Sequence, residues 1–368
     1  RQLSPRIAIV GPVFPYRAGI AYCTTRLAEE LGAEVISFHR QFPKSLYPGS
    51  SDIDETLRAK TPQGARFLLD ILNPLTWLRT AFLLRRERYD AVIVVWWVWV
   101  WALPYLTILA FLPKRTRVIL QCHNVGDKEP AAWKRFLTDR VLRRGDVLVV
   151  HAQTEADDAR RRAPNARVIK TFLPVHELGG PIPSREDARR TLNLHGNVAL
   201  FFGHVRPFKA LDVVLRAWPM LKTEVTLVVA GEVWWKNEEE YRALAAGLPN
   251  VRLDFRFIPD AEIATWFAAA DVVLAPYRIE AQSGVALTAF HFARPVIAST
   301  VGGLPEIITE GENGLLIPPD DPPALAEAVD AFFARTDREA MERQAAASAR
   351  KYSWKEYGRV FDGLVTGE

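Results

Sequence analysis

Short apolar runs alternate along the chain with longer segments of helical periodicity. In the first half the predicted strands are Arg6–Val10, Glu34–Phe38, Ala91–Trp96, Arg117–Cys122, Val147–His151 and Ala166–Lys170. The predicted helices between them include Ile20–Leu31, Leu75–Arg88, Ala131–Arg144 and Thr154–Arg162. Apolar strands that alternate with amphipathic helices are typical of a parallel sheet covered by helices on both faces. The first half is therefore predicted to be a doubly wound α/β domain.

A proline- and glycine-rich segment, residues 174–183, interrupts this alternation and is predicted to be a linker. The alternation then resumes with predicted strands at Ala199–Phe202, Thr226–Ala230, Val251–Phe255, Val272–Pro276, Pro295–Ser299 and Leu315–Ile317. Helices that include Ala210–Leu221 and Asp260–Ala269 separate them. We therefore expect two Rossmann-like domains, residues 1–175 and 184–345, followed by residues 346–368. Such sheets bind ligands beyond the carboxyl ends of their strands, so a cleft between facing edges is the predicted site.

The uncharged segment Ala91–Pro113 is long enough to span a bilayer. It contains four tryptophans: Trp96, Trp97, Trp99 and Trp101. A buried strand followed by an apolar helix explains the same pattern, and Pro104 inside the run favours that interpretation. Contact of exposed tryptophans with a membrane surface is a further expectation.

The net charge of +4 hides an uneven distribution. Residues 1–175 contain 27 basic and 16 acidic side chains, whereas the remainder contains 20 and 27. A basic first half suggests an anionic partner, such as acidic lipid head groups or a pyrophosphate-linked acceptor. An ordinary solvated basic surface is the alternative.

Only two cysteines, Cys23 and Cys122, are present, and they are far apart in the sequence. This spacing argues for a reducing compartment and against a disulfide scaffold or a cysteine-ligated zinc. Because Arg6–Val10 is already a predicted strand, we expect no signal peptide. A cytoplasmic location, with possible association with the inner face of the membrane, is therefore expected.

Residues 203–209, Gly-His-Val-Arg-Pro-Phe-Lys, directly follow a predicted strand and precede a helix. Backbone donors and cationic side chains on such a loop are suited to bind a diphosphate. The alternative is a solvated basic loop, and the position after a strand favours the binding function.

Residues 277–285, Tyr-Arg-Ile-Glu-Ala-Gln-Ser-Gly-Val, also follow a predicted strand. Glu280 can accept hydrogen bonds from two hydroxyl groups, and Gly284 allows backbone donors to approach a ligand closely. Ser283 is also a good helix N-cap, which is the structural alternative. Residues 301–306, with paired glycines, and residues 312–316 complete this half.

In this order and spacing these segments resemble glycosyltransferase family 4, a retaining family with the two-domain GT-B fold. The resemblance covers nearly the whole chain and is most specific from Leu200 to Pro318. It implies two Rossmann-like domains facing a central cleft, with residues 346–368 packing back on the first domain. By this resemblance, Lys209 and Arg206 would bind the donor diphosphate. Glu280 would contact the donor sugar. The backbone of Ser283, Gly284 and Val285 would contact the sugar and the phosphate.

The chain departs from the family pattern at two positions. The second glutamate of the E-x7-E signature, which holds the nucleotide ribose, is replaced by Thr288, whose hydroxyl can form one weaker hydrogen bond. The usual arginine after the loop glycine is His204, and Arg206 is expected to take its place.

Two features of the amino half extend the resemblance. Residues 11–20 resemble the family's first glycine-bearing loop, with Gly19 at a helix N-terminus facing diphosphate and acceptor. His123, after the strand Arg117–Cys122, matches a histidine near the reacting centre. A plain turn and a structural histidine are the respective alternatives.

The resemblance implies a retaining, metal-independent transfer of a hexose-like unit from a nucleoside diphosphate sugar to an acceptor hydroxyl. The donor is expected to be a UDP- or GDP-sugar with no bound cofactor, and the acceptor a sugar or a lipid-linked or polysaccharide precursor; no nucleic-acid partner is expected. Lys209 and Arg206 would stabilise the leaving diphosphate. The alternatives are a phosphorylase-like enzyme, a non-catalytic sugar-nucleotide-binding or assembly subunit, and a membrane-spanning protein.

Overall fold

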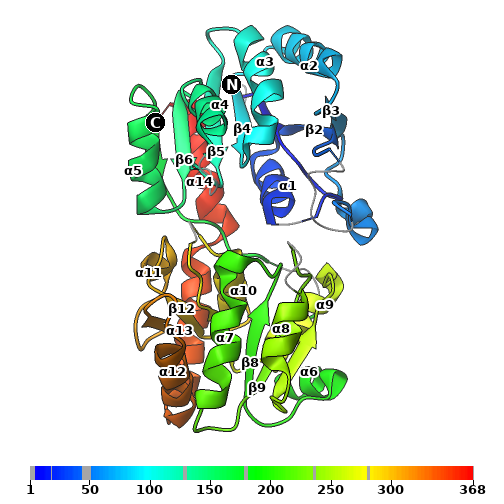
Figure 1. Ribbon diagram of the computed structural model, residues 1–368. Coiled ribbons are helices and arrows are strands. Elements are labelled where there is room, and N and C mark those ends of the chain that lie inside the picture. Colours follow the sequence, from blue (N-terminus) through cyan, green and yellow to red (C-terminus); the bar gives the residue numbers. More distant parts are fainter. Residues whose placement is uncertain are drawn as a thin grey trace. The chain divides into compact units, whose positions relative to one another are not determined.

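The computed structural model describes residues 5–17, 19–43, 51–126, 131–177, 181–234, 238–279 and 282–367 (Figure 1). The chain divides into two compact units. Unit 1 comprises Arg1–Pro174 with Trp354–Glu368, and unit 2 comprises Val175–Ser353. The boundary predicted at residue 346 falls inside the helix α13 (Arg338–Lys351), which belongs to unit 2, so the segment that returns to unit 1 begins at Trp354.

Unit 1 contains a seven-stranded parallel sheet in the order β3-β2-β1-β4-β5-β6-β7. The strands are β1 (Ile7–Val10), β2 (Glu34–Arg40), β3 (Arg66–Asp70), β4 (Ala91–Trp96), β5 (Arg117–Cys122), β6 (Val147–Val150) and β7 (Arg167–Lys170). The helices are α1 (Gly19–Leu31), α2 (Pro74–Glu87), α3 (Ala102–Phe111), α4 (Ala132–Leu142), α5 (Gln153–Arg162) and α14 (Trp354–Thr366), with 3-10 turns η2 (Glu55–Lys60) and η3 (Trp99–Trp101).

Helices cover both faces of this sheet, as the sequence pattern predicts. Side chains of α2, α3, α4 and α5 share one core cluster with one face of the strands. Side chains of α1 and α14 share a second cluster with the other face. Strands such as β4, buried at every residue, are apolar throughout because neither face meets water.

Unit 2 contains a six-stranded parallel sheet in the order β10-β9-β8-β11-β12-β13. The strands are β8 (Val198–Phe202), β9 (Thr226–Ala230), β10 (Val251–Asp254), β11 (Val272–Ala275), β12 (Val296–Ser299) and β13 (Gly314–Ile317). The helices are α6 (Arg185–Leu192), α7 (Leu211–Ala217), α8 (Glu238–Ala245), α9 (Asp260–Ala269), α10 (Gly284–His291), α11 (Leu304–Ile307), α12 (Pro322–Ala334) and α13, with 3-10 turns η4 (Pro207–Lys209) and η5 (Trp218–Met220). Both units are therefore doubly wound, which confirms the predicted fold class.

The apolar segment Ala91–Pro113 forms the buried strand β4, the turn η3 and the helix α3. Trp96 and Trp101 are core residues, at 1% and 0% exposure, so neither is among the exposed tryptophans that were expected to contact a membrane surface. Trp97 and Trp99 are half-buried. Within the described residues, no helix combines the length and the apolar character that a membrane-spanning segment needs.

Candidate functional site

The two ligand-binding segments predicted in unit 2 follow the two strands at the topological switch point of its sheet. β8 and β11 are neighbours, although they are not consecutive in the sequence, and the strand order reverses between them. Residues 203–209 follow β8, and residues 277–285 follow β11. Open α/β sheets bind ligands beyond the carboxyl ends of the strands at this point, so the topology brings the two segments to one place.

Lys209 lies over the glycine that begins the first segment. Gly203 has a φ of 93°, and a methyl group at its Cα would lie 3.3 Å from Lys209 Nζ and 3.5 Å from Val285 Cγ2. Lys209 Nζ is also 5.4 Å from the centre of the Tyr277 ring. The ammonium group of Lys209 is therefore close to the start of α10, where Val285 lies. The structure brings Lys209 and Val285 together, as the sequence predicts for a shared ligand.

A second glycine makes this arrangement possible. Gly231 follows β9, has a φ of 156°, and donates its N–H to Asp254 O at 3.0 Å. A Cβ at Gly231 would lie 2.0 Å from the carbonyl oxygen of Gly203, a distance that no side chain tolerates. Gly231 is therefore needed for the backbones after β8 and β9 to pass each other.

Arg278 holds the segment that carries Lys209 in place through hydrogen bonds and ion pairs. The sequence analysis did not identify this role. Its guanidinium binds both carboxylate oxygens of Asp212, at 2.9 and 2.8 Å, and donates to Pro207 O at 2.7 Å. Its backbone N–H donates to Phe208 O at 2.7 Å, and its Nε pairs with Asp320. Burial alone would raise the pKa of Asp212, but the hydrogen bonds from Arg278 hold it below its usual value. The available sequence signal was the position of Arg278, three residues after the end of a buried strand.

Arg206 and His204 both pack on Trp234. The guanidinium carbon of Arg206 is 4.3 Å from the centre of the Trp234 ring, and the ring of His204 is 4.2 Å from it at an interplanar angle of 32°. Trp234 is 4% exposed, and its indole N–H donates to Glu232 at 3.0 Å. A fixed indole restricts the arginine side chain, so Trp234 is a positioning residue that the sequence analysis did not identify.

The start of α10 has the geometry expected of a capped helix. Ser283 Oγ accepts the backbone N–H of Ala286 at 3.2 Å, so Ser283 is the N-cap. A Cβ at Gly284 would meet no atom within 4 Å. Thr288 is 5% exposed and donates its hydroxyl to Gly284 O at 2.7 Å, which leaves the Thr288 oxygen as an acceptor only. Glu280 lies outside the described residues.

In unit 1, the loop after β1 leads to Gly19 at the start of α1. The loop is held by the bond from Phe14 N to Thr25 Oγ1 at 3.1 Å and by the bond from the Tyr16 hydroxyl to Phe38 O at 2.8 Å. Gly19 is exposed, and a Cβ there would meet no atom within 4 Å. A helix N-terminus at the carboxyl edge of the sheet is a favourable place for an anionic ligand, and the role of Gly19 there stays a prediction.

His123 follows β5 at the same edge and belongs to a buried aromatic network. Its ring lies 5.4 Å from the ring of His151, and His151 Nε2 is 2.7 Å from the Tyr357 hydroxyl of α14. Gln121 donates to the same hydroxyl at 2.9 Å. Burial lowers the pKa of His123 to about 4, so its imidazole is neutral at pH 7. Nε2 of His123 is buried and makes no hydrogen bond within the described part of the chain.

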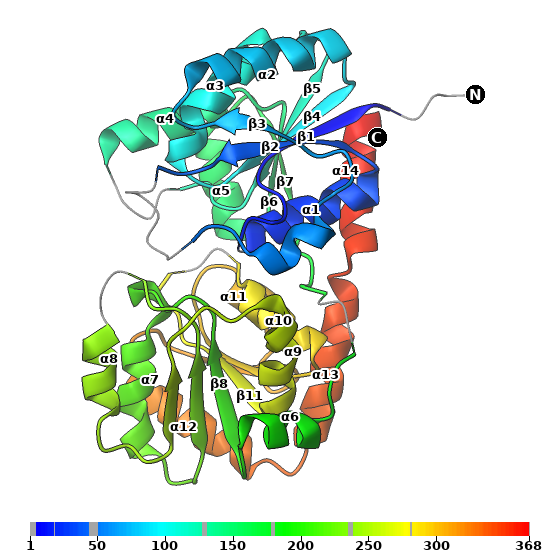
Figure 2. The same ribbon diagram turned by 90° about the vertical axis from the view of Figure 1, so that its right-hand side faces the viewer.

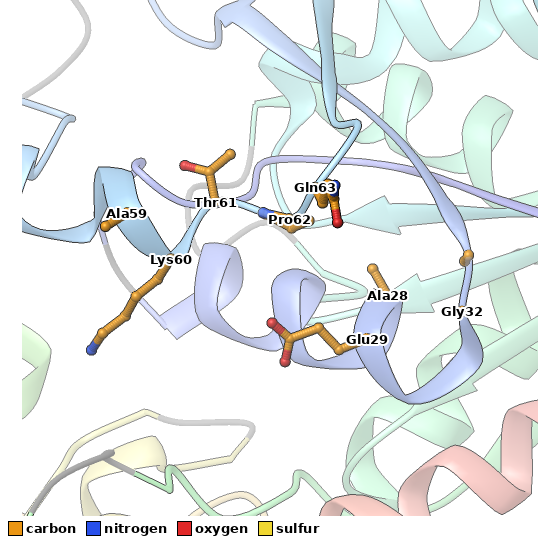
Figure 3. A pocket seen from close by; sticks show the side chains of 9 residues that line it. Ala28, Glu29, Gly32, Ala59, Lys60, Thr61, Pro62 and Gln63 are labelled. Carbon is orange, nitrogen blue, oxygen red and sulfur yellow. The ribbon is translucent and has the colours of Figure 1, made fainter.

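A pocket of about 440 Å³ in unit 1 lies elsewhere. Figure 3 shows it between the last turns of α1 and the connection from η2 to β3, lined by residues 28, 29, 32, 33 and 59–63. α1 ends and β2 and β3 begin at this place, so the pocket lies at the amino edge of the sheet. It is therefore opposite the edge that carries Gly19 and His123, and it is not part of the predicted site.

The fold and the site geometry define a class of protein. Two doubly wound parallel sheets, each with the predicted ligand-binding loops at its carboxyl edge, form the GT-B fold. Comparison with solved structures agrees: sucrose-phosphate synthase from Thermosynechococcus elongatus has a TM-score of 0.76 at 19% identity, covering 99% of this chain and 100% of that one. The Anabaena protein HepE, solved in complex with UDP-glucose, has a TM-score of 0.75 at 16% identity, covering 98% and 100%.

Sequence comparison then gives the family. Residues 196–335 match the family of glycosyl transferases group 1, and residues 18–171 match the glycosyl transferase 4-like domain. The D-inositol 3-phosphate glycosyltransferase of Saccharomonospora viridis is 30% identical over 316 residues, which cover 78% of this chain and 72% of that protein. The chain belongs to the group 1, family 4-like glycosyltransferases, and it is an enzyme of that class.

Proposed function

We propose that the protein transfers a sugar from a UDP- or GDP-sugar to an acceptor hydroxyl with retention at the anomeric carbon. The bond from the anomeric carbon to the diphosphate breaks, a bond to the acceptor oxygen forms on the same face, and the hydroxyl proton leaves with the nucleoside diphosphate. The observation that carries this proposal is the position of Lys209 Nζ, over Gly203 and beside Val285 at the start of α10.

Each predicted residue has a role in this proposal. Lys209 and Arg206 stabilise the two negative charges of the leaving diphosphate electrostatically, in place of a metal ion. Glu280 and the backbone of Ser283–Val285 bind the donor sugar, while Thr288 accepts a hydrogen bond from the ribose in place of the family's second glutamate. Gly19 lies against the diphosphate and the acceptor.

His123 is proposed to contact the bound substrate near the reacting carbon. Its neutral imidazole can donate or accept one hydrogen bond through Nε2, depending on the tautomer. A buried polar atom left unpaired costs free energy, so a ligand hydroxyl at this position would gain a hydrogen bond that the protein itself does not supply.

The acceptor is proposed to carry negative charge, because the first half of the chain has a large excess of basic residues. A pyrophosphate-linked lipid or a phosphorylated polyol fits this requirement. The relative from Saccharomonospora viridis is named for a phosphorylated acceptor, D-inositol 3-phosphate, which supports the second choice. A lipid-linked acceptor would place the enzyme at the inner face of the membrane.

The test is to incubate the purified protein with UDP- and GDP-sugars and a panel of phosphorylated acceptors. Nucleoside diphosphate release and the anomeric configuration of the product are followed by NMR. We expect one donor to be consumed with retention. Binding of donor without turnover by any acceptor or water would instead indicate a non-catalytic sugar-nucleotide-binding subunit, and an inverted product would contradict the proposed mechanism.

A further inference from the structure

Large apolar side chains are exposed together on one side of unit 1. In the described part of the chain ten such side chains are exposed, and seven belong to α2, α3, α4 or the turn before α2. These are Leu72, Leu75, Leu78, Phe82, Leu103, Trp133 and Phe136. Leu75 is 74% exposed and Phe136 is 56% exposed. Exposure of this many large apolar groups at one place is unusual for a monomer and marks an interaction site.

The three helices form one continuous layer. α2 packs against α3, and α3 packs against α4. Phe82 and Phe111 lie 5.2 Å apart between ring centres, and Trp99 and Trp133 lie 4.6 Å apart. Figures 1 and 2 show α2 and α3 side by side over the sheet of unit 1. Because their inner sides belong to the same core cluster, their solvent-facing sides form one surface, which we call the outer surface of α2–α4.

Basic residues are interleaved with the apolar ones on this surface. On α2 the exposed positions 75, 78, 79, 82, 85 and 86 form one stripe of helical spacing, and three of these six side chains are arginines. On α4 the exposed stripe comprises Trp133, Phe136 and Arg140, and the Arg140 guanidinium carbon is 4.9 Å from the centre of the Phe136 ring. Each stripe therefore offers apolar and cationic groups to the same partner.

The charge of the surface is strongly positive. Residues 72–88, 99–115 and 131–144 contain eleven basic and two acidic side chains. The two acidic ones, Glu87 and Asp139, are bonded at 2.8 Å to Arg66 and Arg162, which lie outside these segments. The carboxylates are thus neutralised elsewhere and do not offset the arginines and lysines of the outer surface.

We propose that the outer surface of α2–α4 docks on an anionic lipid bilayer. An interfacial helix buries its leucine and aromatic side chains at the headgroup boundary while its arginines and lysines bind the acidic headgroups. A second copy of the chain would bring the same positive charge against itself, which opposes a homodimer through this face.

The location of the surface gives the docking a purpose. In a parallel sheet the connecting helices begin at the carboxyl edge, so Leu75, Leu103 and Trp133, near the starts of their helices, lie toward the edge that carries Gly19 and His123. A bilayer at this surface would hold a lipid-linked acceptor near the predicted acceptor side of unit 1. This purpose rests on the proposed function, whereas the docking itself is tested without donor or acceptor.

The experiment is co-sedimentation of the full chain with phosphatidylcholine vesicles, with and without phosphatidylglycerol, at low and high salt. We expect binding to the anionic vesicles that weakens with salt, and little binding to neutral vesicles. Sedimentation velocity of the protein alone should show a monomer. Binding independent of anionic lipid, no binding to either vesicle, or a dimer that Leu75→Ser/Phe136→Ser dissociates would overturn the proposal.

Paired variants locate the contact. Arg79→Gln/Arg86→Gln should lower the partition coefficient roughly thirtyfold, since each basic residue near an anionic surface contributes about a factor of five. Leu75→Ser/Phe136→Ser should lower it at least tenfold. The controls lie in unit 2: Arg190→Gln/Arg343→Gln and Ile182→Ser/Met220→Ser replace exposed basic and exposed apolar side chains, respectively. If the control variants lose as much vesicle binding as the α2–α4 variants, the membrane contact is not on α2–α4. Retained UDP binding by the α2–α4 variants would show that their donor site is intact.

Discussion

Three glycines of unit 2 differ in the reason that each position holds glycine. Gly231 is required by the fold, because a Cβ there would collide with the carbonyl oxygen of Gly203. Gly203 has a left-handed backbone and lies under Lys209. Gly284 has neither constraint: it begins a regular helix, and a Cβ would meet open space. The fold does not need glycine at position 284, and we propose that a ligand approaches the backbone closely there.

Gly284→Ala is therefore expected to keep or slightly raise thermal stability, since alanine is the better helix residue by up to about 1 kcal/mol. The same change should raise the KM for the donor at least tenfold, because the methyl group would occupy the space of the donor. Gly363→Ala is the matched control: it lies in α14, also with no atom within 4 Å of a Cβ, and should leave the KM unchanged. An unchanged donor KM in Gly284→Ala would contradict the proposed backbone contact.

The site residues that the sequence predicted are those with a recognisable pattern after a strand. Lys209 and Val285 were predicted from the segments that carry them, and the structure brings the two together. Arg278 and Trp234 were missed because their roles depend on partners distant in the sequence, Asp212 and Arg206 respectively. Such long-range pairs depend on the topology of the sheet, which side-chain type alone does not reveal.

At the scale of elements, buried strands were predictable and peripheral elements were not. The strand Ala91–Trp96 was predicted with its exact bounds because it is apolar throughout. β3 was missed because it is an edge strand with one buried residue among half-buried ones. α6 was missed because Ala188 is its only fully buried residue, although Ser184 and the left-handed Asn193 cap its two ends. Hydrophobic periodicity reports burial, so elements with little burial give little signal.

A buried hydroxyl of the helix α14 is hydrogen-bonded to a strand of unit 1 and to the residue that follows another. Tyr357 is fully buried, and its hydroxyl bonds both His151 and Gln121. Tyr357→Phe removes one hydrogen-bond partner from each of two buried side chains, His151 and Gln121, so it is expected to lower the free energy of unfolding by about 1–3 kcal/mol. Denaturant unfolding with a fluorescence probe measures this difference.

Tyr105→Phe provides the matched comparison for that experiment. Tyr105 is equally buried in unit 1, but its hydroxyl has no hydrogen-bond partner within the described residues. Removal of an unpaired buried hydroxyl should be neutral or stabilising. If both variants lose the same stability, the loss reflects packing of the ring, and the proposed role of the Tyr357 hydroxyl is wrong.

At the scale of the whole molecule, one buried and two half-buried histidines couple folding to pH. Burial lowers the pKa of His123 to about 4 and the pKa of His176 to about 3, and burial followed by the charge of His123 lowers that of His151. Above pH 6.5 these groups are neutral in both the folded and the unfolded chain. Below pH 6.5 the unfolded chain takes up protons that the folded chain does not, so stability falls as the pH falls.

The stability is therefore expected to decline from about pH 6.5 toward pH 4, with His123 contributing at most about 3 kcal/mol over that range. This pH range lies above the range in which Glu87 affects stability. The pKa of Glu87 is lowered from 4.5 to about 2, so its contribution to stability is lost only as the pH falls below 4.5. Thermal unfolding at a series of pH values measures the slope. His123→Gln should flatten the curve between pH 6.5 and 4, with the exposed His39→Gln as control. An unaltered slope in His123→Gln would contradict the account.

The central claim is that Lys209 stabilises the leaving diphosphate, and the most direct test is the kcat/KM of Lys209→Ala for sugar transfer. We expect a loss on the order of a hundredfold or more, by analogy with the removal of one transition-state donor, with the fold unchanged. Lys222→Ala, which removes an exposed lysine of the same unit, should retain full activity. A kcat/KM for Lys209→Ala within a few fold of the parent enzyme would contradict the claim.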